Sequence, residues 1–129
     1  MKMTGHQRWV FAFWVYLGIL LSTFIAAYLQ IIPTEISRFP YYDTILHFFL
    51  LGLAAYFSHQ ALKRRKWKIG KFYIPIAPVI VFFLCIIDEI IQYHVPYRNA
   101  DFLDLVADVC GIITFTLLAE ISPNSYRNK

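Results

Sequence analysis

The chain alternates long apolar stretches with short polar segments. Four of the stretches contain about twenty residues each, which is the length that a helix needs to cross the hydrocarbon core of a membrane. They cover about residues 9–32, 42–62, 72–93 and 102–121. The pattern therefore predicts an all-α fold, a four-helix transmembrane bundle that forms one domain over residues 1–129. Because the first stretch is longer than the core of a signal peptide and has a poor cleavage site around residues 26–27, we expect it to remain as the first helix.

The composition argues against a water-soluble domain. Apolar residues make up 59% of the chain and charged residues only 16%, whereas about a quarter of the residues in a soluble domain are charged. A soluble protein of this size must also keep a large share of its surface in water. The two cysteines, Cys85 and Cys110, fall inside predicted helices. We interpret both as buried reduced thiols, because nothing in their spacing resembles a disulfide framework or a zinc motif.

Basic residues predict the orientation of the helices. The loop over residues 63–71 carries six of the twelve lysines and arginines, and loops rich in these residues stay in the cytoplasm. An even number of helices then places both termini in the cytoplasm as well, and leaves Arg38 and Arg98 as the only basic residues outside. We interpret the basic loop as the orientation signal and as a contact for anionic membrane lipids. Membrane lipids are therefore expected partners, and nucleic acid is not.

Acidic residues show the opposite distribution. Seven of the eight belong to the outer half of the predicted bundle, and Glu120 alone lies at the inner end. Acidic residues contribute little to the orientation of transmembrane helices, so this bias needs another cause.

Polar side chains gather at one depth on three predicted helices. Within each helix they are three or four residues apart, which places them on one helical face. With a rise of about 1.5 Å per residue, His47, Glu89 and Asp108 lie on the order of 5–10 Å below the outer surface. We predict an outward-facing ligand pocket built from Asp43, His47, Glu89, Gln92, Arg98, Asp104 and Asp108.

The charge of this pocket requires compensation. The charges of the four acids and one arginine sum to −3 when the histidine is neutral. Carboxylates that lie close together away from water cannot all stay ionised without a compensating charge. The pocket must therefore take up protons, a metal ion or a cationic ligand group. The cofactor is unknown, and a divalent cation is one option. Oxygen ligands favour Mg²⁺, Ca²⁺ or Mn²⁺, and a histidine admits Zn²⁺; the candidate ligands are His47, Glu89, Asp104 and Asp108.

Several pocket residues also have structural interpretations. Asp43 and Asp101 are suited to cap helices, and Gln92 to join two helices by hydrogen bonds. His47 can hold the bundle together by bonding a carboxylate, and Arg98 can pair with Asp101 or Asp104. Glu89 and Asp108 are the hardest to explain in this way, because acids inside a membrane are usually functional. His59, near the basic loop, is interpreted as an interfacial residue.

The polar residues also carry a family resemblance. The segments Asp43-x-x-x-His47-Phe48, Asp88-Glu89-x-x-Gln92, Pro96-x-Arg98 and Asp104-x-x-x-Asp108-x-x-Gly111 resemble the VanZ-like family of small bacterial membrane proteins. The resemblance implies a multi-pass protein of the bacterial cytoplasmic membrane. Because the namesake of the family is linked to low-level teicoplanin resistance, it also implies an envelope precursor or a lipophilic glycopeptide as ligand. The chain departs from the family pattern in having Thr44 where a basic residue is frequent and Asp108 where asparagine is usual.

Three functions remain open. The first is a binding protein of the cell envelope, whose outward-facing pocket takes a lipid headgroup, an envelope precursor or a lipophilic glycopeptide. The second is a metal-assisted or acid–base hydrolase or transferase acting on lipid phosphates, with His47, Glu89 and Asp108 as candidate catalytic residues; since no established motif such as H-E-x-x-H is present, whether the chain is an enzyme stays undecided. The third is a proton-coupled transporter, which four helices without an inverted repeat could form only as a homo-oligomer. We expect few polar residues in the inner half, and hence access from one side.

Overall fold

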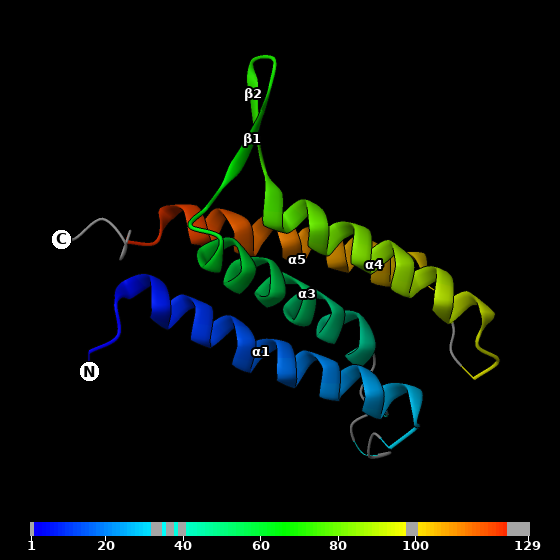
Figure 1. The fold of residues 1–129 in the computed structure, drawn as a ribbon. Helices are drawn as coiled ribbons and strands as arrows, with labels where there is room; N and C mark the ends of the chain where they lie inside the picture. Colours follow the sequence, from blue (N-terminus) through cyan, green and yellow to red (C-terminus); the bar gives the residue numbers. More distant parts are fainter. Residues whose placement is uncertain (1, 32–34, 36–37, 39–40, 98–100, 124–129) are drawn as a thin grey trace.

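The computed structural model describes residues 2–31, 35, 38, 41–97 and 101–123. Four helices and one β-hairpin follow each other along the chain as α1 (Gly5–Tyr28), α3 (Tyr42–Ala61), β1 (Lys66–Ile69), β2 (Phe72–Pro75), α4 (Ile76–His94) and α5 (Phe102–Ile121). The helices lie lengthwise and alternate in direction, so that the start of α1, the hairpin and the end of α5 share one end of the bundle (Figure 1). The predicted all-α class and four-helix bundle are confirmed.

Helices α1, α4 and α5 are long and apolar enough to cross a membrane, and they are the three such helices among the described residues. Helix α3 contains 20 residues, as α5 does, but it carries more polar side chains. Its His47, His59 and Gln60 are buried inside the bundle. Helix α3 packs against α1, α4 and α5, and this central position shields its polar residues from lipid.

Two glycines allow α3 and α5 to approach closely. A Cβ atom added to Gly111 would lie 2.1 Å from the backbone oxygen of Phe48, and one added to Gly52 would lie 2.3 Å from the ring of Phe115. Gly111 is one turn beyond Asp108, and Phe48 follows His47 directly. This contact therefore sets the distance between the two helices that carry the histidine and its aspartate.

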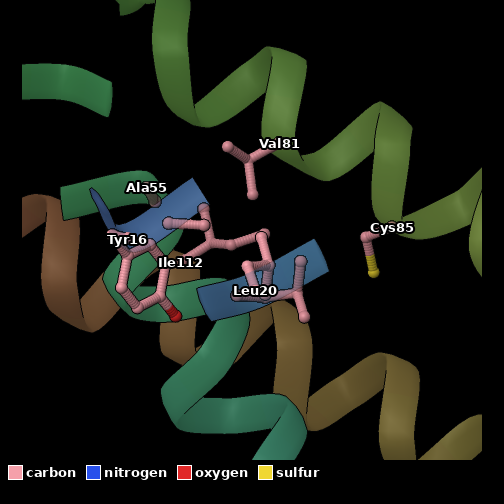
Figure 2. Close-up of a cluster of buried hydrophobic side chains, with 8 residues drawn as sticks. Tyr16, Leu20, Ala55, Val81, Cys85 and Ile112 are labelled. Atoms are coloured by element: carbon pink, nitrogen blue, oxygen red, sulfur yellow. The ribbon is translucent and has the colours of Figure 1, made fainter. Parts of the chain in front are cut away.

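The buried core is small and lies where α1, α3, α4 and α5 meet (Figure 2). It includes Tyr16 and Leu20 of α1, Val81 and Cys85 of α4, and Ile112 of α5. Many other large apolar side chains lie on the outside of the helices, among them Phe83, Ile113 and Leu117. Such an apolar surface is expected of helices in contact with lipid, because lipid tails do not penalise exposed hydrocarbon.

The structure corrects the predicted bounds of the first helix. It begins at Gly5 because Thr4 and Gln7 form a capping box, in which each side chain accepts a hydrogen bond from the other residue's backbone. The helix ends at Tyr28, before the predicted end at residue 32.

The predicted third helix was wrong at its start, because residues 72–75 form β2 of an antiparallel hairpin. The hairpin turns at Gly70, whose φ of +61° suits glycine. Pro75 then precedes α4, where a proline does not interrupt helical hydrogen bonds. Trp67, Ile69 and Phe72 are exposed on this hairpin, which projects away from the helices (Figure 1).

Candidate functional site

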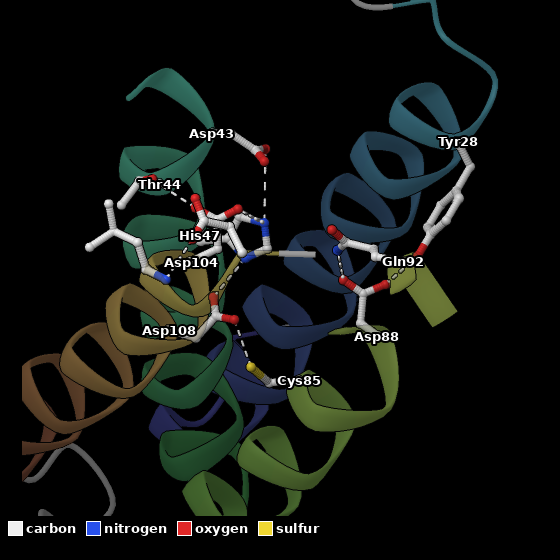
Figure 3. A network of polar contacts seen from close by, with 11 residues as sticks. Tyr28, Asp43, Thr44, His47, Cys85, Asp88, Gln92, Asp104 and Asp108 are labelled. Carbon is white, nitrogen blue, oxygen red and sulfur yellow. Dashed lines mark hydrogen bonds and ion pairs between the residues drawn. The ribbon is translucent and has the colours of Figure 1, made fainter. Parts of the chain in front are cut away.

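The imidazole of His47 lies among three carboxylates (Figure 3). His47 belongs to the first turns of α3, which begins at the end of the bundle opposite the hairpin (Figure 1). Its Nδ1 is 2.9 Å from Asp108 Oδ1, and its Nε2 is 3.8 Å from Asp43 Oδ1 and 4.0 Å from Asp104 Oδ2. His47, Asp104 and Asp108 retain 5%, 3% and 1% of their accessible surface. These charges are therefore shielded from bulk water and interact more strongly than at a surface.

Two further side chains hold the carboxylates in place. Thr44 Oγ1 donates to Asp104 Oδ1 at 2.7 Å, and Cys85 Sγ donates to Asp108 Oδ2 at 2.6 Å. Both oxygens of Asp108 are thus occupied, one by His47 and one by Cys85. Cys85 is buried as predicted, although its thiol acts as a donor and does not merely pack; Cys110 is exposed, contrary to the prediction.

Glu89 belongs to the same cluster. One ligand atom each from His47, Glu89 and Asp108 lie within 4.8 Å of one another, and the same holds for Asp43, His47 and Asp104. Glu89 Oε1 is buried and has no hydrogen-bond partner among the described residues. The structure therefore brings together five of the predicted pocket residues, from three helices.

The other predicted residues lie elsewhere or have other partners. Gln92 Nε2 donates to Asp88 Oδ2 at 2.6 Å, away from the acids of the cluster. Asp101 caps α5 by accepting from the backbone of Leu103. Arg98 lies outside the described residues.

Asp88 joins α4 to α1. Its Oδ1 accepts a hydrogen bond of 2.7 Å from the hydroxyl of Tyr28, while its Oδ2 accepts from Gln92. The sequence did not predict this role, because Asp88 lies about 100° away from Glu89 around the helix.

Replacing Tyr28 by phenylalanine should lower the free energy of unfolding by about 1.5–3 kcal/mol, since it removes one hydrogen bond to a carboxylate and leaves the ring in place. Thermal unfolding in one detergent measures the change. Tyr93→Phe is the matched control, because Tyr93 is 78% exposed on α4, the helix that carries Asp88. Equal losses in the two variants would show that the bond to Asp88 contributes nothing.

An apolar cavity of about 460 Å³ begins beside this cluster. It lies between α1, α3 and α4, with Asp88, Cys85 and Asp108 at one end and Ala61 and Leu62 at the other. Most of its wall is aliphatic or aromatic; the lining includes Leu17, Leu20, Leu51, Ala54, Val81 and Leu84. We call this cavity the apolar groove. It was not predicted, since its walls come from helices that are far apart in sequence.

A second polar cluster occupies the hairpin end of the bundle. His59 is fully buried, and its Nε2 lies 2.7 Å from Glu120 Oε1, which also pairs with Lys66 at 3.0 Å. Arg64 donates to Gln60 Oε1 at 3.1 Å and to the backbone oxygen of Ser122 at 2.9 Å. The expectation that the inner half holds few polar residues was therefore wrong, whereas the interfacial position expected for His59 stays a prediction, with its side chain buried inside the bundle. His59 and Glu120 are 61 residues apart along the chain, and Arg64 and Ser122 are 58 apart, so local spacing could not reveal these contacts.

The family described as VanZ/LLP1 matches residues 4–122 of this sequence. The chain belongs to the VanZ/LLP1 family. The match confirms the resemblance carried by residues 43–111 and extends it over the first helix. No curated protein and no solved structure matches the chain. This VanZ/LLP1 protein is thus a membrane protein in which acidic residues from three of the polar segments surround His47.

Proposed function

We propose that this VanZ/LLP1 protein binds a lipid or a lipid-linked envelope precursor, with the polar head at the His47 cluster and one hydrocarbon chain in the apolar groove. The observation that carries the proposal is that the two features meet, because Cys85 and Asp108 belong to both. A ligand that fills both must be polar at one end and apolar along its length, which is the description of a membrane lipid.

The dimensions of the groove support a single hydrocarbon chain. Its volume falls within the range of about 300–1,000 Å³ usual for small-molecule sites. Along α4 the lining runs from Ala77 to Ile91, which corresponds to about 21 Å at 1.5 Å per residue. That is roughly two thirds of a hydrocarbon core of about 30 Å, so one hydrocarbon chain can lie along the groove inside the membrane.

The orientation of the protein is part of the proposal. We place it in the bacterial cytoplasmic membrane, with the hairpin and both termini in the cytoplasm and the His47 cluster near the outer surface. Ten of the twelve basic residues belong to the hairpin end or to the terminal segments, and such residues are retained in the cytoplasm.

We expect a green fluorescent protein fused after Lys129 to be fluorescent, and alkaline phosphatase at the same position to be inactive. A cysteine introduced at Gly70 should be protected from a membrane-impermeant maleimide in whole cells and labelled after lysis. Active phosphatase, or labelling of Gly70→Cys in intact cells, would reverse the orientation.

One observation also favours a reaction on a lipid phosphate. Asp108 holds His47 through Nδ1, so that Nε2 points toward Asp43 and Asp104 without a hydrogen bond to either, and such a nitrogen can act as a general base. Release of phosphate from a lipid phosphate in reconstituted vesicles would distinguish an enzyme from a binding protein, provided that His47→Gln abolishes the release.

The proposal is tested by native mass spectrometry of the protein purified in mild detergent. We expect wild type to retain about one lipid per chain, and Ala54→Phe, which fills the groove, to lose it. Ile113→Phe is the control, because Ile113 is 55% exposed on α5 and outside the groove lining. Lipid retained equally by all three proteins would contradict the proposal. Displacement of the lipid by added teicoplanin would identify a lipophilic glycopeptide as a second ligand of the same groove.

A further inference from the structure

The geometry points to a divalent-cation site formed by Asp43, His47 and Asp104, in which Asp108 positions the histidine without touching the ion. The biological use of this site, though not its existence, rests on the proposed function. A cation held there would let an acidic pocket bind the phosphate of a lipid head.

The tautomer of His47 follows from its contact with Asp108. An ionised carboxylate only accepts hydrogen bonds, so the 2.9 Å contact places the proton on Nδ1. In the neutral ring, Nε2 then carries a free lone pair. The side chain is 6% exposed, and within the described part of the chain Nε2 has no hydrogen-bond partner, since its nearest carboxylate oxygens are 3.8 and 4.0 Å away. A carboxylate bonded to one ring nitrogen while the other binds an ion is the usual arrangement of metal-binding histidines.

The carboxylates are oriented to complete the site. Asp104 uses Oδ1 to accept from Thr44, which leaves Oδ2 facing the ring of His47. Ligand atoms of Asp43, His47 and Asp104 lie within 4.8 Å of one another. A shift of a few tenths of an ångström would bring each within about 2.0–2.2 Å of a central ion, the range of metal–nitrogen and metal–oxygen bonds for Zn²⁺.

The ligand set also selects the class of ion. Two carboxylates and one imidazole suit Mn²⁺ or Zn²⁺ better than Ca²⁺, which prefers oxygen ligands alone. The charges of two carboxylates and one divalent ion sum to zero, so the ion removes the electrostatic repulsion between the acids. The side chain of Asp43 is 38% exposed, and a phosphate oxygen that completes the coordination would approach from this side.

The alternative site formed by His47, Glu89 and Asp108 fits less well. Both oxygens of Asp108 already accept hydrogen bonds, from His47 and from Cys85. An ion bound there through Nδ1 would replace the hydrogen bond between His47 and Asp108, because Nδ1 is the nitrogen that carries the proton. Glu89 thus remains available for the lipid head.

Electron paramagnetic resonance of Mn²⁺ tests the site in chelator-stripped protein in detergent, without added lipid. We expect one bound Mn²⁺ per chain that Zn²⁺ displaces, with spin-echo modulation from one imidazole nitrogen. Asp43→Asn and Asp104→Asn should each weaken Mn²⁺ binding by at least roughly 10–100-fold. That is the loss of metal affinity caused by removing a residue that only supports a ligand, and these residues are ligands themselves. Asp101→Asn is the matched control, because it removes a carboxylate at the same end but keeps a helix cap, and its affinity should equal that of wild type.

Absence of stoichiometric Mn²⁺ and Zn²⁺ binding to wild type would overturn the inference and leave a protonated His47 as the compensating charge. Binding that survives Asp43→Asn but is lost in Glu89→Gln would move the ion to the alternative site and overturn it as well. Because the imidazole modulation is measured on wild type, a variant that fails to fold does not weaken the test. Mn²⁺ binding by a protein that retains no lipid would refute the proposed lipid binding and would leave the cation site intact.

Discussion

Replacing Gly111 by alanine is expected to lower the free energy of unfolding by about 3 kcal/mol, at the upper end of the effects of overpacking. The added methyl group would lie 2.1 Å from the backbone oxygen of Phe48. A backbone atom cannot rotate away as a side chain can, so α3 as a whole would have to move away from α5. Thermal unfolding of the purified protein in a single detergent, followed by circular dichroism, measures the loss.

Gly18→Ala provides the control for this variant. Gly18 lies inside α1, and an added Cβ would meet no atom within 4 Å among the described residues. Since alanine favours a helix by up to about 1 kcal/mol over glycine, this variant should be as stable as wild type or slightly more so. Similar destabilisation in both variants would show that the close approach of α3 and α5 is not what Gly111 provides.

Replacing His47 by alanine is expected to cost about 3–5 kcal/mol, the range found when one partner of a buried ion pair is removed. Asp104 and Asp108 would lose the group that faces them, in a place where each is at most 3% exposed. The double variant His47→Ala/Asp108→Asn should recover part of the loss, because it removes one of the stranded charges. A double-mutant cycle from thermal unfolding measures this coupling.

His94→Ala separates this effect from the removal of any histidine. His94 is exposed at the end of α4, where its ring contacts the backbone oxygen of Ile90. We expect a change within about 0.5 kcal/mol, as for most surface substitutions. If His47→Ala were no more harmful than His94→Ala, the cluster would not be a coupled set of buried charges.

The helices and the main site residues could be predicted because their signals are local. Apolar runs of helical length predicted the bounds of α5 and all of α4 but its start, and a spacing of three or four residues predicts which polar side chains share a face. Asp43, His47, Asp104 and Asp108 were therefore predicted together, and the structure brings them together. Their roles in binding stay predictions.

What the sequence did not predict depends on contacts between distant segments. The hairpin replaces a predicted helical turn because strand pairing with residues 66–69 satisfies the backbone of residues 72–75. Cys85 and Thr44 have no motif that marks them as donors to Asp108 and Asp104, which are 23 and 60 residues away. The apolar groove exists only because α1 and α4 both pack against α3, and no single segment encodes it.

Photo-crosslinking tests the central claim, that one lipid lies with its head at the His47 cluster and its chain in the apolar groove. The protein would be reconstituted with a phospholipid that carries a diazirine in one acyl chain, irradiated and digested. We predict adducts on groove-lining residues such as Leu20, Val81 and Leu84, which Ala54→Phe should abolish. Adducts spread over Ile113, Leu117 and other outward residues of α5, and unchanged by Ala54→Phe, would show only the surrounding bilayer and would contradict the account.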